Sequence, residues 1–333
     1  MSRIRTTTIV AVGSALALTL TACNTEGSTD TESSGASASS AAKQYTIGLA
    51  NQQQSVTFPA AIAKGAQAKA DELGIKLIVL DSQGDQAKQA SQVQDLIAQK
   101  VDGIILVPLS PGPAQALVDQ AAAANIAVGT AHGYVGADRT ADDPYPKLKF
   151  IIDENELGAG QIAGDMAVAA LPDGGKVAVI TGAAGFVENT TRVTKFTDAL
   201  KAKGGYTVVA TQPGNWTKQD GQSACQNILA ANPDVNLFYA ISDDMAVGCG
   251  AAIKAAGSSA KVVGVGGSQG GIDAIKAGTL YGTVCYKPVD EGAMAVQAMY
   301  DSLTGKLTGA PTTTFYDTPG VTKDNVDTCQ AQW

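Results

Sequence analysis

The chain has 333 residues and a formal net charge of -8 at neutral pH, from 31 acidic and 23 basic side chains. An acidic chain without a basic cluster is a poor candidate for binding nucleic acid, whose phosphates attract clustered lysine and arginine. A single histidine and the lack of a Cys-x-x-Cys motif give no pattern typical of a zinc site, so we expect no metal.

Residues 1–22 have the layout of an export signal. Arg3 and Arg5 precede an uncharged apolar run, residues 9–20, which is too short to span a membrane comfortably. It leads into Leu-Thr-Ala-Cys at residues 20–23, which resembles the lipobox of bacterial lipoproteins. That resemblance implies cleavage before Cys23, lipid on its sulfur and tethering to the outer face of the bacterial cell membrane. The alternative is an ordinary signal followed by a chance cysteine.

Residues 23–43 form the expected tether. After Cys23 this stretch has small and polar residues, with no large aliphatic or aromatic side chain. It cannot bury enough surface to offset its ordering entropy, so we expect a disordered linker. A flexible coil of this length spans about 25 Å, which would hold the folded part just above the lipid headgroups.

From residue 44 onward, strand and helix patterns alternate. We expect strands at 45–50, 76–81, 103–109 and 127–131, with helices at 59–73, 86–100 and 113–125. The pattern then repeats with strands at 176–182, 206–211, 235–241 and 261–266, and helices at 188–203, 218–231 and 243–256. Continuous apolar strands between helices are typical of a parallel sheet covered on both faces. The chain is therefore predicted to be α/β, with two similar doubly wound parallel-sheet lobes.

Ligands of doubly wound sheets lie beyond the carboxyl ends of the strands, so two such lobes would enclose a ligand cleft between them. The loops that follow the strands are rich in amide, hydroxyl and aromatic groups, which suit a neutral, polyhydroxylated ligand. The expected ligand contacts are Gln52, Phe58, His132, Thr190, Trp216, Ser242, Gly266 and Tyr286.

Four cysteines follow Cys23, and an even number in an exported chain favours disulfides. We expect Cys225–Cys249, because both fall on helices predicted to be neighbours, and then Cys285–Cys329. Buried free thiols are the alternative.

Six segments resemble the type I periplasmic sugar-binding proteins, in the ribose-binding branch of ABC-importer receptors. They are GAQAKADELG (65–74), LDSQ (80–83), VQDL (93–96), GAGQIAGD (158–165), NPDV (232–235) and DDMAVG (243–248). The resemblance implies a hinge of three segments near 150–155, 284–288 and 313–319, and a helix at 290–303 that packs on the first lobe. The first lobe would hold 44–150 and 288–312, and the second 151–287 and 313–333.

The ligand contacts match the family less well. Phe58 and Trp216 fall on aromatic positions that pack on the sugar in the family. The charged and amide residues of the family pattern are replaced in this chain. His132-Gly133 stands for an Asp-Arg pair, and Thr190 stands for an arginine, with Arg192 two residues later. Ser242 replaces an asparagine, Gly266 an aspartate and Tyr286 the hinge glutamine. The loss of the charged clamp argues against ribose, galactose or glucose in their usual poses. It favours a short acyclic polyol, a deoxy sugar or a cyclitol.

Several of these residues also have a structural interpretation. His132 could pack within its loop, Trp216 could cover a hydrophobic patch, and Tyr286 could fill the hinge. Asp243 opens a helix and is expected to be an N-cap rather than a contact. Glu188, Asp153 and Glu154 are expected to be solvated or paired within the hinge.

The motifs that resemble catalytic signatures do not support an enzyme. Residues 266–270 satisfy Gly-x-Ser-x-Gly, but a hydrolase needs a histidine after that serine, and the only histidine precedes it. The glycines in 158–164 fall inside a predicted helix, so they are no dinucleotide fingerprint, and the chain has no Walker motif. We expect neither catalysis nor a cofactor.

The sequence therefore predicts a lipid-anchored receptor that delivers a small sugar or polyol to the membrane subunits of an ABC importer by lobe closure. We expect a monomer. A sensory receptor that signals to a membrane chemoreceptor or kinase is the alternative. A repressor-type regulator would share the fold, but the lipobox and linker occupy the place of its DNA-binding helices.

Overall fold

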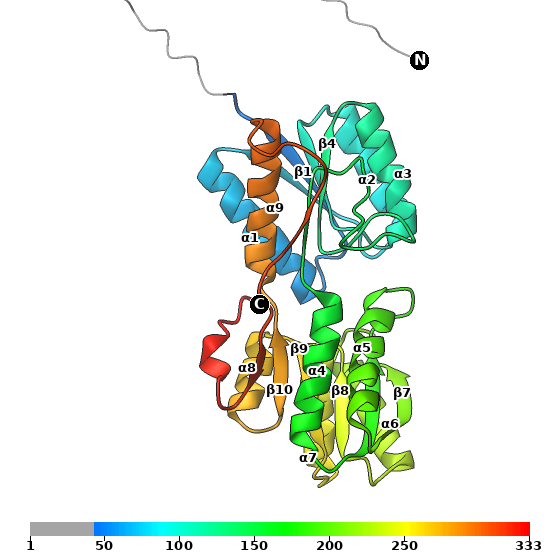
Figure 1. The fold of residues 1–333 in the computed structure, drawn as a ribbon. Coiled ribbons are helices and arrows are strands. Elements are labelled where there is room, and N and C mark those ends of the chain that lie inside the picture. The colour runs from blue at the N-terminus through cyan, green and yellow to red at the C-terminus, as the bar shows by residue number, and fades with distance from the viewer. Residues whose placement is uncertain (1–42) are drawn as a thin grey trace, which may run out of the picture. The chain divides into compact units, whose positions relative to one another are not determined.

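The computed structural model describes residues 43–333 (Figure 1). The predicted signal peptide, the predicted lipidation site Cys23 and residues 24–42 of the predicted linker lie outside this part. Lys43, which we assigned to the linker, belongs to the folded part, because its Nζ lies 2.7 Å from the carboxylate of Asp102. Between residues 43 and 333, no helix has both the length and the apolar character needed to cross a membrane.

The first lobe is built on a six-stranded sheet in the order β11-β5-β4-β3-β1-β2, and every neighbouring pair in it is parallel. Its strands are β1 (Thr46–Asn51), β2 (Lys76–Asp81), β3 (Gly103–Leu106), β4 (Ala127–Ala131), β5 (Ile151–Asp153) and β11 (Thr313–Phe315). Its helices are α1 (Thr57–Leu73), α2 (Gln86–Ala98), α3 (Pro111–Ala123) and α9 (Pro288–Leu303). Apolar side chains of α1 and α9 pack on one face of the sheet and those of α2 and α3 on the other.

The second lobe repeats the design with the sheet order β12-β10-β9-β8-β6-β7. Its strands are β6 (Gly175–Thr181), β7 (Tyr206–Pro213), β8 (Leu237–Ala240), β9 (Lys261–Gly266), β10 (Gly282–Cys285) and β12 (Gly320–Thr322). Its helices are α4 (Glu156–Ala170), α5 (Glu188–Lys203), α6 (Lys218–Ala231), α7 (Asp243–Ala255) and α8 (Gln269–Lys276), and a 3₁₀ turn, η1, covers Val326–Thr328. Only β12 is antiparallel to its neighbour. The predicted fold class is thus confirmed.

The boundaries between the lobes differ from the expected ones at two places. Residues 151–153 and 313–315, which we assigned to the second lobe, form β5 and β11 of the first-lobe sheet. They pair with each other, with Ile152 opposite Thr314, so each segment adds a strand at the sheet edge before it crosses. The first lobe therefore extends to residues 153 and 315.

Helix α9 packs closely on α1, as the family resemblance implies for 290–303 (Figure 1). The helices approach most tightly at Gly65 of α1, where an added Cβ would lie 1.8 Å from the carbonyl oxygen of Val289. A side chain there would force the helices apart. Gly65 therefore allows the segment that returns from the second lobe to complete the core of the first.

The four cysteines after Cys23 form two disulfides, both in the second lobe. Cys225 of α6 is joined to Cys249 of α7, and Cys285 at the end of β10 is joined to Cys329 after η1. These are the same two pairs that the sequence favours. The second bond ties the C-terminal segment to β10, next to the sheet edge.

Candidate functional site

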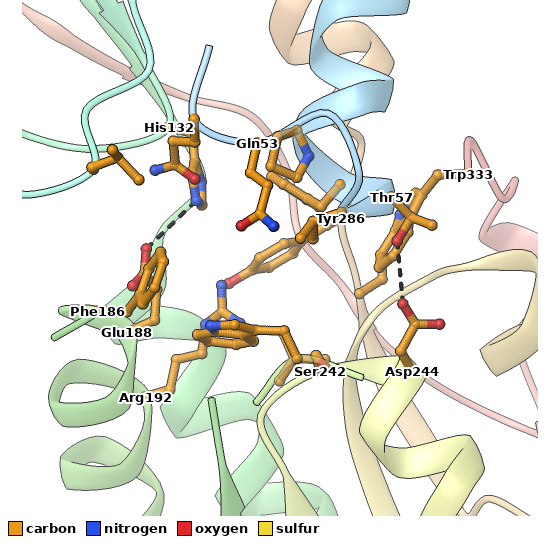
Figure 2. Close-up of a pocket in the computed structure, with 18 residues that line it drawn as sticks. Gln53, Thr57, His132, Phe186, Glu188, Arg192, Ser242, Asp244, Tyr286 and Trp333 are labelled. Atoms are coloured by element: carbon orange, nitrogen blue, oxygen red, sulfur yellow. Dashed lines mark hydrogen bonds and ion pairs between the residues drawn. The ribbon is translucent and has the colours of Figure 1, made fainter. Parts of the chain in front are cut away.

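A cavity lies between the lobes, where the carboxyl ends of both sheets meet (Figure 2). In the first lobe, Gln52 follows β1 and His132 follows β4, while Phe58 stands in the first turn of α1. In the second lobe, Ser242 follows β8 and Gly266 ends β9. The lining thus comes from loops that the alternation of strands and helices brings to one edge of each sheet.

The volume of this cavity is about 80 Å³. One water molecule needs roughly 10–15 Å³ on this measure, so the space holds about five to eight waters. That room suits a solute of monosaccharide size or smaller and is too small for an oligosaccharide.

Aromatic rings form much of the wall. The ring of Phe58 lies 5.0 Å from that of His132, 5.9 Å from Tyr286 and 5.7 Å from Trp333, measured between centroids. Across the cavity, Phe186 makes an edge contact with Trp216 at 5.6 Å. Ring faces of this kind pack well on the C–H surfaces of a polyhydroxylated ring or chain.

Trp216 is held in place by an unusual backbone. Asn215 and Trp216 both have positive φ, 49° and 65°, in the left-handed region that non-glycine residues rarely adopt. Gly182 makes room for the indole, since a Cβ there would lie 2.0 Å from a ring carbon. The indole Nε1 is buried and has no hydrogen-bond partner within residues 43–333. Trp216 therefore offers both a ring face and a free donor to a bound molecule.

Arg192 is the buried cation at the base of the cavity (Figure 2). Its Nε and Nη2 donate to the two carboxylate oxygens of Glu156, and its Nη1 donates to the carbonyl oxygen of Ile241 at 2.7 Å. The hydroxyl of Tyr286 donates to Glu156 as well, at 3.1 Å, and the guanidinium lies 5.2 Å from the Tyr286 ring centroid. Burial raises the pKa of Glu156 to about 7, although the charge of Arg192 opposes the rise.

His132 stands between two carboxylates, and its backbone has positive φ, 56°. Its Nδ1 is 2.6 Å from an oxygen of Glu154 behind the cavity, and its Nε2 is 3.5 Å from an oxygen of Glu188 in the wall. Burial alone would lower the pKa of His132, but the charges of Glu154, Glu291 and Glu188 hold it well above its usual value. Both cations of the lining are therefore already matched by protein carboxylates, which disfavours an anionic ligand.

One hydrogen bond joins the two rims of the cavity. Thr57 of α1 donates from its hydroxyl to Asp244 of α7 at 3.2 Å. Trp333 adds a second bridge, because its ring packs on Phe58 while its indole nitrogen donates to the carbonyl oxygen of Gly266 at 3.3 Å. With the contact between His132 and Glu188 at 3.5 Å, the lobes are therefore joined on both sides of the cavity (Figure 2).

Seven of the eight expected ligand residues line this cavity: Gln52, Phe58, His132, Trp216, Ser242, Gly266 and Tyr286. Thr190 does not, and its side chain is exposed. Residues two positions apart on a helix point about 200° away from each other, so Arg192 and Glu188, one turn apart, face the cavity instead. Ser242 is also the N-cap of α7, accepting from the backbone of Met245, so Asp243 is not the cap we expected.

Other lining residues escaped the sequence analysis: Gln53, Thr57, Phe186, Asp244 and Trp333. Gln53, Thr57 and Phe186 lie within loops that we expected at the cleft, where no pattern marks which side chains turn inward. Trp333 lies at the C-terminus, after η1, and reaches the cavity only because the C-terminal segment folds back to it. Its aromatic character is the one sequence feature that could have marked it as a lining residue.

The model of the periplasmic binding protein domain matches residues 47–307. The ribose import binding protein of Haemophilus influenzae is 33% identical over 266 residues, covering 78% of this chain and 85% of the relative. The xylitol-binding protein of Mycolicibacterium smegmatis is 28% identical over 320 residues, covering 96% of this chain and 86% of the relative.

Among solved structures, an ABC transporter solute-binding protein from Bacillus halodurans with bound myo-inositol superposes with a TM-score of 0.79. It is 21% identical and covers 87% of this chain and 98% of its own. At that identity the likeness shows the fold alone, and the ligand must be argued from the cavity.

Proposed function

Because this chain belongs to the type I periplasmic sugar-binding proteins, in the ribose-binding branch, we propose that it is the extracytoplasmic receptor of an ABC importer for one small, neutral sugar or polyol. Members of this family are binding proteins and not enzymes. The relatives named above carry ribose and xylitol in their names, and both compounds are neutral and polyhydroxylated.

The observation that carries the proposal is the make-up of the cavity. Aromatic faces line it, a buried indole donor has no partner, and both lining cations are matched by carboxylates. A carboxylate or phosphate ligand would meet Glu188 and Asp244 without a free cation to balance it. A neutral polyol meets rings along its C–H surface and donors and acceptors at its hydroxyls.

Binding would proceed by lobe closure. The solute contacts loops of both lobes, so these contacts exist together only when the lobes are close, and they shift the population toward that form. The closed form would then dock on the membrane subunits of the importer. Because the cavity draws on both lobes of a single chain, a monomer is sufficient for this mechanism.

A thermal-shift panel tests the ligand class. It should contain pentoses, deoxy sugars, acyclic polyols and cyclitols, together with sugar phosphates, amino acids and nucleosides. We expect at least one neutral polyhydroxylated compound to raise the melting temperature and the anionic compounds to leave it unchanged. Stabilisation by amino acids or nucleosides alone would reject the ligand class.

The lipid anchor is a separate part of the proposal and rests on the motif at residues 20–23. Cys23→Ala should move the protein from the membrane fraction to the medium and abolish incorporation of labelled palmitate. Retention of the label in that variant would contradict lipidation at Cys23. Loss of uptake of the bound solute on deletion of the gene would distinguish import from sensing.

A further inference from the structure

A second cluster of polar residues lies behind His132. His132, Asp153, Glu154 and Glu291 each place one nitrogen or oxygen so that these four atoms lie within 4.8 Å of one another. The exposed fractions of these residues are 8%, 1%, 0% and 0%. Of the four, only His132 lines the solute cavity, so this cluster is a distinct place in the molecule.

The four residues come from three places far apart in the sequence, because Asp153 and Glu154 are neighbours. His132 follows β4, Asp153 ends β5 and Glu154 begins the first crossing between the lobes, while Glu291 lies in the first turn of α9, just after the second crossing. The cluster therefore joins the edge of the first-lobe sheet to two segments of the hinge.

Among the described residues, no hydrogen bond with proper geometry reaches the carboxylate oxygens of this cluster, although the hydroxyl of Tyr134 approaches Asp153 and the backbone of His132 approaches Glu291. Both oxygens of Asp153, Glu154 and Glu291 are buried without such a bond. Nδ1 of His132 approaches Glu154 to 2.6 Å but makes no hydrogen bond with proper geometry. Buried carboxylates in native proteins are almost always hydrogen-bonded, paired or bound to a metal.

Nearby protein cations do not balance this charge. Among residues 43–333, the arginine next to the cluster is Arg192, whose nearest nitrogen is 3.9 Å from Glu154 and whose hydrogen bonds go to Glu156 and Ile241. The arrangement is thus short of positive charge by about two units when its acids ionise.

We propose that His132, Asp153, Glu154 and Glu291 bind one divalent transition-metal ion, of the Zn²⁺ or Mn²⁺ type, at the hinge. One imidazole with three carboxylates is a donor set that such ions accept, whereas Ca²⁺ and Mg²⁺ prefer oxygen ligands alone. Ligand atoms of a tetrahedral site with bonds of about 2.0–2.1 Å lie about 3.3 Å apart. The spacings here range from 2.6 Å between His132 and Glu154 up to 4.8 Å, so the side chains must adjust around a bound ion, some moving closer together and this pair moving apart.

The outer surroundings of His132 fit this role. A metal-ligating histidine almost always donates its second ring N–H to a carboxylate or carbonyl oxygen, which fixes the ring. Here Glu188 lies 3.5 Å from Nε2, on the side away from the cluster. Nδ1 is then the metal-binding nitrogen. Because His132 and Glu188 also line the solute cavity, the ion orients two residues of its wall.

The expectation of no metal site rested on the single histidine. Carboxylates from two other places in the chain, the adjacent Asp153 and Glu154 and the distant Glu291, supply the remaining ligands here, and no local spacing motif marks them. The ion would hold β5 and α9 together at the hinge without touching the solute.

Metal analysis of the metal-depleted full-length protein tests the proposal, using a purification tag without histidine. After equilibrium dialysis against micromolar ZnCl₂ or MnCl₂, we expect one equivalent of ion by mass spectrometry and a raised melting temperature. No retained ion with either salt would overturn the proposal. MgCl₂ at the same concentration should have no effect.

Variants locate the ion. Glu291→Gln and Asp153→Asn should each weaken ion binding at least tenfold. Asp243→Asn is the matched control, because Asp243 is an equally buried carboxylate that accepts hydrogen bonds from Thr283 and Ser268 away from the cluster. Equal ion binding in Glu291→Gln and the wild type would place the ion elsewhere and reject the site.

A spectroscopic readout avoids variants that fail to fold. The chain has one histidine, so ¹⁵N-histidine labelling gives the ring signals of His132 alone. Zn²⁺ should move the Nδ1 resonance strongly and leave Nε2 protonated, and an unchanged ring would contradict the site. The sugar and polyol panel is independent of these measurements, so failure of one proposal does not decide the other.

Discussion

The two lobes share one sheet order but contribute different chemistry to the cavity. The first lobe supplies Gln52, Phe58 and His132, and it contains no disulfide within the described residues. The second supplies the buried ion pair of Arg192 and Glu156, the strained Trp216 loop and both disulfides. The architecture is thus repeated, whereas the chemistry resides in loops that the sheet topology does not constrain.

The difference also bears on stability. The first lobe is completed by packing of α1 against α9, while the second combines packing with covalent bonds and a buried charge pair. Changes to the ion pair and the disulfides should therefore have large effects on stability. Changes to ring faces in the cavity will mainly affect binding.

The largest expected effect is at Arg192. Arg192→Met leaves Glu156 buried without its partner, which should lower the free energy of unfolding by about 3–5 kcal/mol. Adding Glu156→Gln should recover part of that loss, because it removes the unpaired carboxylate. Urea unfolding followed by circular dichroism measures both, with the exposed Lys201→Ala on the same helix as the control. Wild-type stability in Arg192→Met would show that the pair contributes nothing.

The disulfides come next. They close segments with sequence separations of 24 and 44 residues. On the chain-entropy relation their loss lowers the free energy of unfolding by about 3.5 and about 4 kcal/mol. Paired alanine variants should show this order in urea, with Cys285→Ala/Cys329→Ala the less stable. If both variants were as stable as the wild type, the disulfides would not contribute to the difference in stability between the lobes.

A pH effect of about 3 kcal/mol is expected from Asp243 of the second lobe. Burial raises its pKa to about 6, although hydrogen bonds from Thr283 and Ser268 oppose the rise. The folded state therefore binds the proton more tightly than the unfolded state, and stability falls as pH rises from about 4 to about 6. The total fall in the free energy of unfolding is about 3 kcal/mol, because the pKa of Asp243 differs by about two units between the two states and each unit corresponds to about 1.36 kcal/mol.

Asp243→Asn checks this prediction. The variant should lack the slope, so the difference in the free energy of unfolding between wild type and variant should change by about 3 kcal/mol from pH 4 to pH 7. A constant difference over that range would show that Asp243 does not titrate abnormally.

The smallest effect concerns the solute itself. Trp216→Ala should weaken binding of the most stabilising compound of the panel by about 1–3 kcal/mol, because the indole loses its contact with the solute. Isothermal titration calorimetry measures the change. Phe315→Ala, at an exposed aromatic outside the cavity, should leave affinity unchanged. Unchanged affinity in Trp216→Ala would make Trp216 a packing residue.

Apolar periodicity was sufficient to predict the two lobes and the place of the cavity between them. Strands such as β2, β4 and β9 were predicted at their observed bounds, because their apolar runs are closed by polar residues or glycine. The short strands at and next to one edge of each sheet were not predicted. β5, β10, β11 and β12 have only three or four residues each, and they form because segments distant in the sequence meet there.

The same limit applies to the site. Loop positions gave Phe58, His132 and Trp216, since any residue after a strand lies near the cleft. The phase of helix α5 decides between Thr190 and Arg192, and the family pattern pointed to the wrong one. The partners of His132 come from β5, its crossing segment and α9, so no local pattern could reveal them.

The most direct test uses the only two tryptophans of the chain, Trp216 and Trp333, because both line the cavity. Intrinsic fluorescence should be titrated with each neutral sugar and polyol of the panel. We predict a saturable change for at least one compound, which is greatly reduced in Trp216→Phe. No change with any compound that stabilises the protein would place binding outside this cavity and contradict the account.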